Sequence, residues 1–498
     1  MTDERHPHHA ERGWLHEEPV RSREAFDQQR RLFIAGATAL SALAILTGCD
    51  PPSSRDGRRL PRATDELEPP PGEALTSGTE PKPPPPPRMI QRPLPPTSEP
   101  IVRVRIATVR APVRVIRIEG DGGSVLIDQG DGLPAKTVAL PASVESTIGG
   151  WVVIAAVGTR NAATFSFASP SIEVRPTAGA GRGVRLAKDI AACGSLPWGA
   201  RLVARTDEAI GAVDVVTHVP MEQYLPGVLA KELYNTWSLQ THLAQAVAAR
   251  SYAVCEIAQS LDSHFDVVAG EASQAWIGVT NHKASLDAVR QTRGMVMIWD
   301  RRVVPAYYSS TCGGRPANAS DAIANNEFNA IAPLQVTSAM ARDCCRAAPQ
   351  WRWSMRMPLP ETARRLSGWA KTDRPVMARI EGIRNIEVFT VNAVGRPLAF
   401  RITDAKNQLF EVPAERLRWA FNADVPGVPA PTGRVKSADF TAKVSATSIT
   451  LEGRGFGHGV GMCQYGAEAL SKKGQTWRDI LARYYPGSEV FATYAAKA

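Results

Sequence analysis

The carboxylate of Glu232 is in a sequence environment in which an isolated acid could carry out proton transfer. It lies near the end of a predicted short helix, residues 224–233, beside a break at Tyr234 and Asn235 and among apolar and aromatic neighbours. Desolvation in such a place raises the pKa of a carboxyl group, as a catalytic acid requires, whereas a close ion pair with Arg250 would lower it. The sequence leaves both arrangements open.

Arg250 belongs to the second helix that the pattern predicts after this break. Thr236 is the predicted N-cap of that helix, and Trp237 falls in its first turn. An apolar stripe follows at helical spacing, made of Leu239, Leu243, Val247, Val254, Ile257 and Leu261. Arg250 falls inside this stripe, so we expect it to be buried, where a guanidinium needs an acceptor or an anion beside it.

A second unusual stretch is the glycine block, residues 453–467 (GRGFGHGVGMCQYGA). Glycine occupies every second position from Gly453 to Gly461. In an extended chain this spacing removes Cβ atoms from one side, so that the backbone can approach a ligand or another segment closely. His458 is embedded in the block, where both a structural role and a role in a binding groove are open.

The two regions together resemble the SpoIID/LytB domain family, named after stage II sporulation protein D. The resemblance depends on HVPMEQYL (residues 218–225), Glu232, Trp237 and AQAVAARSYA (244–253), and on the glycine block followed by ILARYYPG (480–487). It implies an α+β, SpoIID-like fold with a helical region around the glutamate and β-rich segments. It also implies a lytic transglycosylase that cleaves the glycan strands of peptidoglycan, with Glu232 at the position of the family's catalytic glutamate.

The resemblance further implies a set of glycan-binding residues near Glu232. One family segment matches residues 267–278 (VVAGEASQAWIG) and points to Gln274 and Trp276, although Trp276 could equally fill the core. Some members carry a histidine just before the block AYYSSTCGG (306–314), where Tyr308 or Ser309 stands here; this departure argues against carrying over a metal site. The whole expected set is Gln245, Arg250, Gln274, Trp276, Ser310, His458 and Gln464.

The amino-terminal residues 1–49 resemble a Tat-type lipoprotein signal. Arg30 and Arg31 precede a short apolar run that ends in LTGC, so Cys49 is the predicted lipidation site. An uncleaved anchor is the alternative. Either reading places the protein outside the cytoplasm, and the first predicts a periplasmic, membrane-anchored lipoprotein. The proline-rich residues 50–100 are predicted to be a disordered tether.

Seven cysteines are present, and Cys49 is assigned to lipid. In an oxidising periplasm the others permit disulfides, and we expect Cys312 to pair with Cys344 or Cys345. Zinc bound by Cys312, one of that adjacent pair, Cys463 and His458 is an alternative, since certain family members are zinc proteins, and free thiols are another. The activity expected from the resemblance requires no cofactor. The six remaining cysteines are Cys193, Cys255, Cys312, Cys344, Cys345 and Cys463.

Alternating apolar residues predict a β-rich part over residues 101–217, ahead of a SpoIID-like catalytic domain at 218–490 with a β-rich insertion at about 355–445. The net charge is +9. No nucleic-acid module is recognisable, and a basic groove would suit the muramic carboxylates of bare glycan, although scattered solvated cations would give the same total. Besides the enzyme, two other functions are open: a non-catalytic enhancer of a cell-wall amidase and a glycan-binding scaffold.

Overall fold

The computed structural model describes residues 91–110, 115–119, 123–177, 183–187, 194–205, 212–270, 273–324, 326–337, 343–431 and 433–494. It contains both helices and many strands, so the predicted α+β class is confirmed. The predicted signal, the lipidation site Cys49, Cys193 and most of the tether lie outside the described residues. Within those residues, no helix has the length and apolar character needed to cross a membrane.

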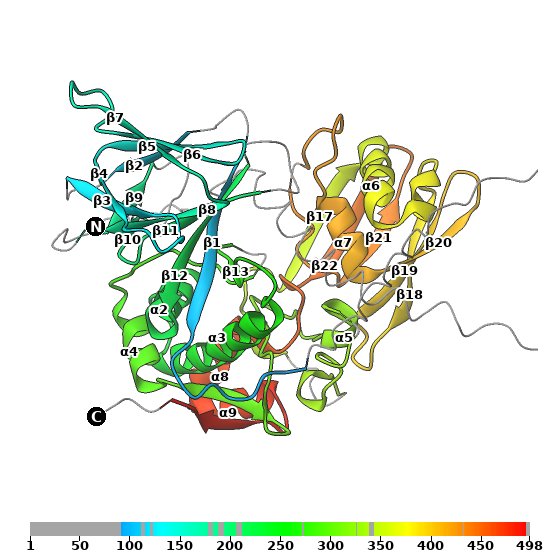
Figure 1. The fold of residues 1–498 in the computed structure, drawn as a ribbon. Helices are drawn as coiled ribbons and strands as arrows, with labels where there is room; N and C mark the ends of the chain where they lie inside the picture. The colour runs from blue at the N-terminus through cyan, green and yellow to red at the C-terminus, as the bar shows by residue number, and fades with distance from the viewer. Residues whose placement is uncertain are drawn as a thin grey trace, which may run out of the picture.

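Two β-sheets form the part of the fold that comes first in the chain (Figure 1). The longer sheet has the order β13-β1-β12-β11-β8-β3-β4, with β1 (Ile101–Val109), β3 (Ser124–Asp128), β4 (Lys136–Ala139), β8 (Ser171–Pro176), β11 (Ala200–Ala204), β12 (Val213–Pro220) and β13 (Val267–Val268). The other has the order β10-β9-β2-β5-β6-β7, with β2 (Val115–Glu119), β5 (Ala142–Thr147), β6 (Gly150–Ala155), β7 (Ala163–Phe167), β9 (Val184–Leu186) and β10 (Ser195–Leu196).

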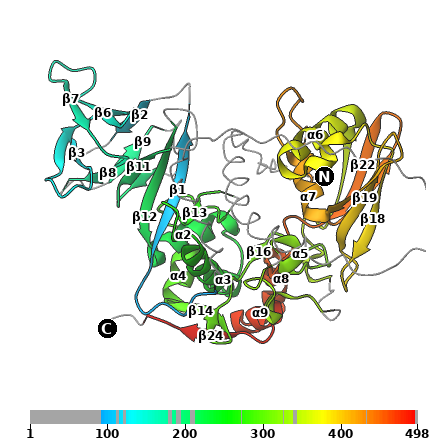
Figure 2. The same ribbon diagram turned by 45° about the vertical axis from the view of Figure 1, so that its right-hand side comes forward.

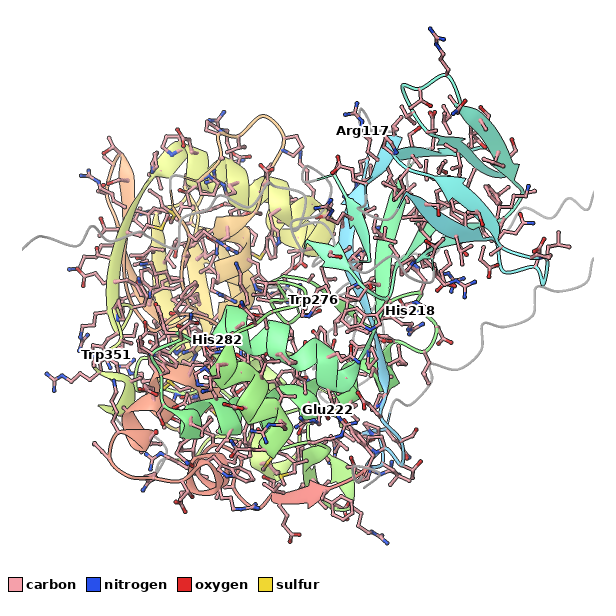
Figure 3. All side chains as sticks on the ribbon, turned by 90° about the vertical axis from the view of Figure 1, so that its left-hand side faces the viewer. Arg117, His218, Glu222, Trp276, His282 and Trp351 are labelled. Atoms are coloured by element: carbon pink, nitrogen blue, oxygen red, sulfur yellow. The ribbon has the colours of Figure 1, made fainter. Side chains whose placement is uncertain are left out.

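Alternation of apolar and polar residues explains how these sheets bury one face. In β2, Ile116 and Ile118 are buried while Arg117, labelled in Figure 3, is exposed. Strand β12 is buried along almost its whole length, as expected for a strand covered on both faces. It pairs with β1 and runs directly into the first helix of the next layer, so the sheet fixes where that helix begins.

The helical layer carries the residues of interest. It contains α2 (Met221–Glu232), α3 (Leu239–Gln259) and α4 (Lys283–Gln291), and the chain returns near its end to add α8 (Gln464–Ser471) and α9 (Trp477–Tyr484) beside α3 (Figure 2). Two small sheets complete it: β14 (Met295–Trp299) between β15 (Arg302–Val303) and β24 (Glu489–Ala492), and β16 (Tyr308–Ser309) parallel to β23 (Met462–Cys463).

The predicted start of α3 is wrong by two residues. Ser238, not Thr236, caps the helix, because its hydroxyl accepts a hydrogen bond from the backbone N–H of Gln240. Trp237 therefore precedes the helix. The predicted single stripe is also too narrow, since α2, α4, α8, α9 and β14 surround α3 and bury it on nearly all sides.

Residues 352–454 form a second layer with its own core. It contains α6 (Leu359–Asp373), η4 (Pro375–Arg379), α7 (Ala414–Asn422) and two sheets: β17 (Arg352–Pro358), β22 (Ser448–Arg454), β21 (Phe440–Val444), and β18 (Asn385–Val391), β19 (Pro397–Thr403), β20 (Leu409–Pro413). Phe400 stacks on Phe440 at the centre of that core. Short elements α5 (Ala319–Ala322), η1 (Ala332–Leu334) and η3 (Asp343–Cys345) connect it to β16.

The last residues of the predicted tether pack on the folded protein. Arg92 is 7 % exposed and donates hydrogen bonds to the backbone carbonyls of Trp299 and Arg302 at 3.0 and 3.1 Å. The carbonyl of Pro100 accepts from the N–H of Met221. Residues 91–100 therefore belong to the folded part of the chain, contrary to the prediction.

Glu256, near the end of α3, gives the fold a pH dependence that can be measured. Burial raises the pKa of Glu256 to about 8, although a hydrogen bond with Tyr252 acts in the opposite direction. Between the usual carboxyl pKa and about pH 8 the folded chain then binds more protons at this residue than the unfolded chain, so stability falls as pH rises through that window. We expect Glu256→Gln to lose less thermal stability than wild type between pH 5 and 9.

Thermal unfolding followed by circular dichroism across this range tests the prediction. Glu411→Gln is the matched control, because the Glu411 side chain is 54 % exposed. Parallel curves of melting temperature against pH for wild type and Glu256→Gln would contradict it.

Candidate active site

Three segments of the chain meet at the carboxylate of Glu232. Glu232 is the last residue of α2 and is half-buried. Its Oε1 accepts a hydrogen bond from the backbone N–H of Ala275 at 3.2 Å, and its Oε2 accepts one from Nε2 of Gln464, the first residue of α8, at 3.0 Å. The carboxylate is therefore oriented by groups that lie far from it in sequence.

Arg250 does not pair with Glu232. Its guanidinium forms a bidentate ion pair with Glu222: Nε donates to Oε1 at 2.9 Å, and Nη2 donates to Oε2 at 2.8 Å. Glu222 also accepts from the hydroxyl of Tyr494 at 2.6 Å and from the N–H of Gly294 at 3.2 Å. Glu222 and Glu232 are ten residues apart on one helix, about 15 Å along its axis. The alternative of a Glu232–Arg250 ion pair is thus excluded by the geometry.

The segment after β13 reaches Glu232 through its backbone. Gln274 is fully buried, where it bonds to the hydroxyls of Tyr224 and Tyr308 and to the carbonyl of Ala249. Trp276, labelled in Figure 3, is 5 % exposed and donates its indole N–H to the carbonyl of Tyr224. These two side chains anchor the segment in the core and leave the N–H of Ala275 directed at Glu232.

The structure corrects the expected glycan-binding set. Gln245, Arg250 and Gln274 are 0 % exposed, and Trp276 is a core residue, so direct contact of these side chains with a glycan does not fit their burial. Of the seven expected residues, the structure brings Gln464 to Glu232. Gln245, on α3, has no hydrogen-bond partner for either side-chain polar atom within the described part of the chain.

Ser310 and His458 are both half-buried. The backbone carbonyl of Ser310 accepts from the N–H of Tyr465, so this residue supports the start of α8. Nδ1 of His458 accepts from the N–H of Val460 at 3.0 Å, and the ring meets Tyr307 edge to face. Both residues thus have structural contacts.

The glycine block is a folded loop rather than an extended strand. Gly455, Gly457, Gly459 and Gly461 all have positive φ, between 65° and 98°, a region that other residues rarely adopt. A Cβ on Gly461 would lie 2.1 Å from the carbonyl oxygen of Tyr307. The glycines therefore let the loop lie directly on the chain around β16, and this contact places Gln464 beside Glu232.

An aromatic cluster, Tyr234, Trp237 and Tyr465, flanks this site. The ring of Trp237 lies 5.3 Å from that of Tyr234 and 5.0 Å from that of Tyr465, and the two tyrosine hydroxyls are 3.2 Å apart. Tyr234 is 38 % exposed. Tyr234 and Trp237 follow Glu232 closely in sequence, and Tyr465 follows Gln464. Their nearness to those two residues was the available signal for the cluster, which the expected set did not include.

The cysteines partly follow the predictions. All five described cysteines are free thiols. Cys312, Cys345 and Cys463 gather in one cluster, the three-thiol cluster, which does not include Cys344 or His458. Cys344 instead accepts from the guanidinium of Arg483 at 3.5 Å. Hydrogen bonds with Cys312 and Cys463 lower the pKa of the Cys345 thiol.

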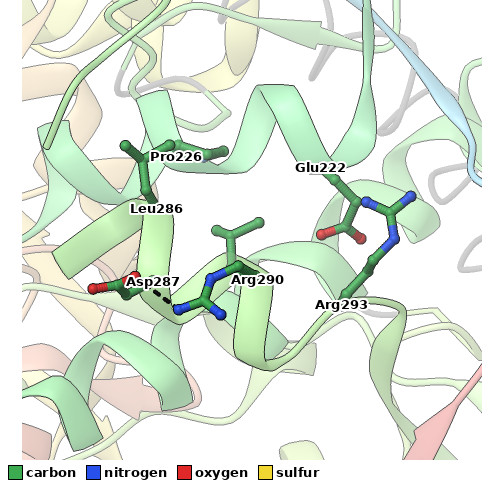
Figure 4. A pocket seen from close by; sticks show the side chains of 7 residues that line it. Glu222, Pro226, Leu286, Asp287, Arg290 and Arg293 are labelled. Carbon is green, nitrogen blue, oxygen red and sulfur yellow. Dashed lines mark hydrogen bonds and ion pairs between the residues drawn. The ribbon is translucent and has the colours of Figure 1, made fainter. Parts of the chain in front are cut away.

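A cavity of about 280 Å³ lies between α2 and α4 (Figure 4). Glu222, Pro226, Leu286 and two arginines, Arg290 and Arg293, are among its lining residues. It is at the opposite end of α2 from Glu232, and the charges around it are engaged with protein partners: Glu222 with Arg250, Arg290 with Asp287, and Arg293 with Glu99. The cavity is therefore separate from the candidate active site.

Comparison with known proteins finds a family match over this part of the chain. Residues 209–299 match the family model SpoIID, described as stage II sporulation protein. This range extends from β12 to β14 and contains Glu232 and the whole of α3. The match therefore covers α2, α3 and α4 of the helical layer, but not α8 or α9.

Curated relatives are similar over about half of this chain. An uncharacterized protein of Brachyspira hyodysenteriae is 26 % identical over 278 residues, which are 55 % of this chain and 68 % of that protein. The amidase enhancer of Bacillus subtilis is 25 % identical over 297 residues, 53 % of this chain but only 40 % of the enhancer. Stage II sporulation protein D of Bacillus subtilis is 25 % identical over 291 residues, 55 % of this chain and 75 % of that protein. These comparisons support the resemblance to the SpoIID/LytB family that the sequence motifs indicated.

Proposed function

We propose that this protein is a peptidoglycan lytic transglycosylase that cleaves between N-acetylmuramic acid and N-acetylglucosamine and leaves anhydro-muramic ends. The observation that carries the proposal is the placement of Glu232. Its carboxyl group is half-buried and held by two donors from distant segments, at the position that the family resemblance assigns to the catalytic glutamate. The other strong candidate acid on α2, Glu222, is already engaged with Arg250.

In the proposed reaction, Glu232 acts twice. As an acid it protonates the glycosidic oxygen, and the bond from that oxygen to C1 of the muramic residue breaks. As a carboxylate it then accepts the proton of the muramic C6 hydroxyl, whose oxygen bonds to C1 and closes the anhydro ring. Water does not attack, so one carboxyl group serves both steps, whereas an ordinary glycosidase usually needs two.

The neighbours of Glu232 suit this double role. The N–H groups of Ala275 and Gln464 each donate to one carboxylate oxygen, so the carboxyl group is held in one orientation for both proton transfers. The aromatic cluster offers apolar ring faces, against which the carbon-bound hydrogens of a sugar ring can pack. Since Tyr234 is 38 % exposed, this surface is accessible next to the carboxyl group.

Product analysis tests the proposal. Peptide-free glycan strands are incubated with the purified protein, and the new ends are identified by mass spectrometry. Anhydro-muramic ends are the expected product, because they require intramolecular attack by the C6 hydroxyl. Reducing ends would show that water attacked, and the transglycosylase assignment would then be wrong.

A second function is favoured by one comparison, since one relative is named an amidase enhancer. In that case the chain would bind peptidoglycan and stimulate a partner amidase without cutting glycan. Release of peptides by an added amidase, measured with and without this protein, separates the two functions. Stimulation that survives Glu232→Gln, with no cleavage of bare glycan, would favour the enhancer.

We also propose that the protein is exported and anchored through a lipid on Cys49. The twin arginines at 30–31 and the LTGC sequence support this. Cys49→Ala is expected to lose fatty-acid labelling and to leave the membrane fraction, whereas Cys344→Ala should keep both. Fractionation and labelling in cells measure the effect. Detection of the intact segment 30–48 in the mature protein would contradict the proposal.

A further inference from the structure

The three-thiol cluster joins three segments that are distant in sequence. Cys312 follows β16 at a Gly-Gly turn, Cys345 ends η3, and Cys463 ends β23 and precedes α8. Their Sγ atoms all lie within 4.8 Å of one another. Each of the three residues is at most 9 % exposed. Such a convergence of buried sulfur atoms needs a physical reason beyond packing.

The spacing suits one metal ion. Zinc–sulfur bonds of about 2.3 Å in a tetrahedron place two ligand sulfurs about 3.8 Å apart. The Sγ atoms of Cys312 and Cys345 are 3.8 Å apart. A disulfide would require this pair to close to about 2.05 Å. The third sulfur, on Cys463, accepts a hydrogen bond from the N–H of Cys312 at 3.4 Å and lies within 4.8 Å of the other two.

Ligand type and surroundings select the kind of ion. Thiolates bind soft cations and not the hard, oxygen-seeking magnesium or calcium. Trp351, Tyr465 and Tyr484 pack against the cluster, so the charge of three thiolates must be balanced in a largely apolar place. A divalent ion balances more of this charge than a monovalent copper ion does, which favours zinc.

We propose that Cys312, Cys345 and Cys463 bind one zinc ion as three thiolates, with the fourth position left for water or another small ligand. Binding releases the thiol protons to solvent. Cys344 lies outside the site, since its sulfur accepts from Arg483. The ion would link three segments: the turn after β16, the end of η3, and the residue before α8.

This link would also affect the proposed active site, because it fixes the position of a residue that contacts Glu232. Cys463 is followed immediately by Gln464, whose amide donates to Glu232. Zinc at the cluster would therefore hold the first turn of α8 and keep that donor in place. This second step rests on the proposed function, whereas the metal site itself does not.

The chain supplies a matched pair of variants, Cys345→Ser and Cys344→Ser, at adjacent positions. Full-length protein is purified in mild detergent without reductant, and its metal content is measured by mass spectrometry after dialysis. We expect about one zinc per chain in wild type and in Cys344→Ser, and loss of the zinc in Cys345→Ser and Cys312→Ser. Zinc that dialysis removes from wild type, or that Cys345→Ser retains, would overturn the proposal.

Two further measurements guard against a variant that fails to fold. Cobalt added to the metal-free wild type should give the intense thiolate-to-metal absorption of a sulfur-rich site, and zinc should abolish it. Peptide mapping of the unreduced wild type should find no bond between Cys312 and Cys345, and a stoichiometric disulfide there would overturn the site. If the protein binds one zinc per chain but does not cleave glycan, the metal site is confirmed and only the proposed activity is wrong.

Discussion

Glu232→Gln is expected to lower glycan cleavage by roughly a hundredfold to ten-thousandfold, the usual effect of losing an acid-base group, while the protein stays folded. Glutamine keeps the size of the side chain, and its one amide oxygen can still accept from one of the two donors, the N–H of Ala275 or the amide of Gln464. It cannot transfer the proton in either step. Binding of bare glycan should survive, because the aromatic cluster is unchanged.

The rate of appearance of new glycan ends, divided by the folded fraction, measures this effect. Glu411→Gln serves as the control for removal of a carboxylate at an exposed position. Because Arg250 pairs with Glu222 and not with Glu232, Glu232→Gln leaves that buried ion pair intact, and the unfolding free energy should change little. Full activity of a well-folded Glu232→Gln protein would remove the enzyme assignment.

The sequence did not predict the partner of Arg250, and it left open an ion pair with Glu232. Helical periodicity indicates that Arg250 faces the core, and burial then requires an acceptor. Two glutamates of α2, Glu222 and Glu232, could have supplied it. Which one does so depends on how α2 and α3 cross and on the position of β14, where Gly294 and Met295 add contacts to the pair. Such tertiary geometry is not contained in a local pattern.

The glycine block shows a different limit of prediction from sequence, because one spacing of glycines fits two backbone conformations. Glycine at every second position was interpreted as a strand with one bare side, because a repeat of two is the repeat of a strand. Glycine also adopts positive φ easily, and Gly455 to Gly461 use that freedom instead. The sequence predicted a close approach of this backbone to a ligand or to another segment, and the structure shows the second: the loop lies against the chain around β16.

The start of α3 was misplaced because several capping residues compete there. Thr236 and Ser238 both favour N-cap positions, and local preference does not separate them. The structure selects Ser238 through α8: the carboxylate of Glu468 accepts from the N–H of Ser238 at 3.0 Å and from the hydroxyl of Thr241 at 2.8 Å. A residue more than two hundred positions away thus decides where the helix begins.

The buried pair of Glu222 and Arg250 leads to the second large effect, on stability. Glu222 is 9 % exposed and Arg250 is fully buried. Removing one partner of such a pair leaves an uncompensated charge in the interior, which typically costs about 3–5 kcal/mol. We therefore expect Glu222→Gln to lower the free energy of unfolding by an amount of this order. The glycan cleavage rate per folded molecule should stay near that of wild type, since Glu222 is about 15 Å from Glu232 along α2.

Urea unfolding of Glu222→Gln, Arg250→Met and the double variant tests this expectation as a double-mutant cycle. Replacing both partners by uncharged side chains removes the stranded charge, so the double variant should be more stable than the sum of the two single changes predicts. The pattern is the reverse of that for Glu232→Gln, where activity falls and stability holds. If Glu222→Gln were as stable as wild type, or if the two single effects simply added, the contact between these side chains would not be the strong buried pair that the geometry indicates.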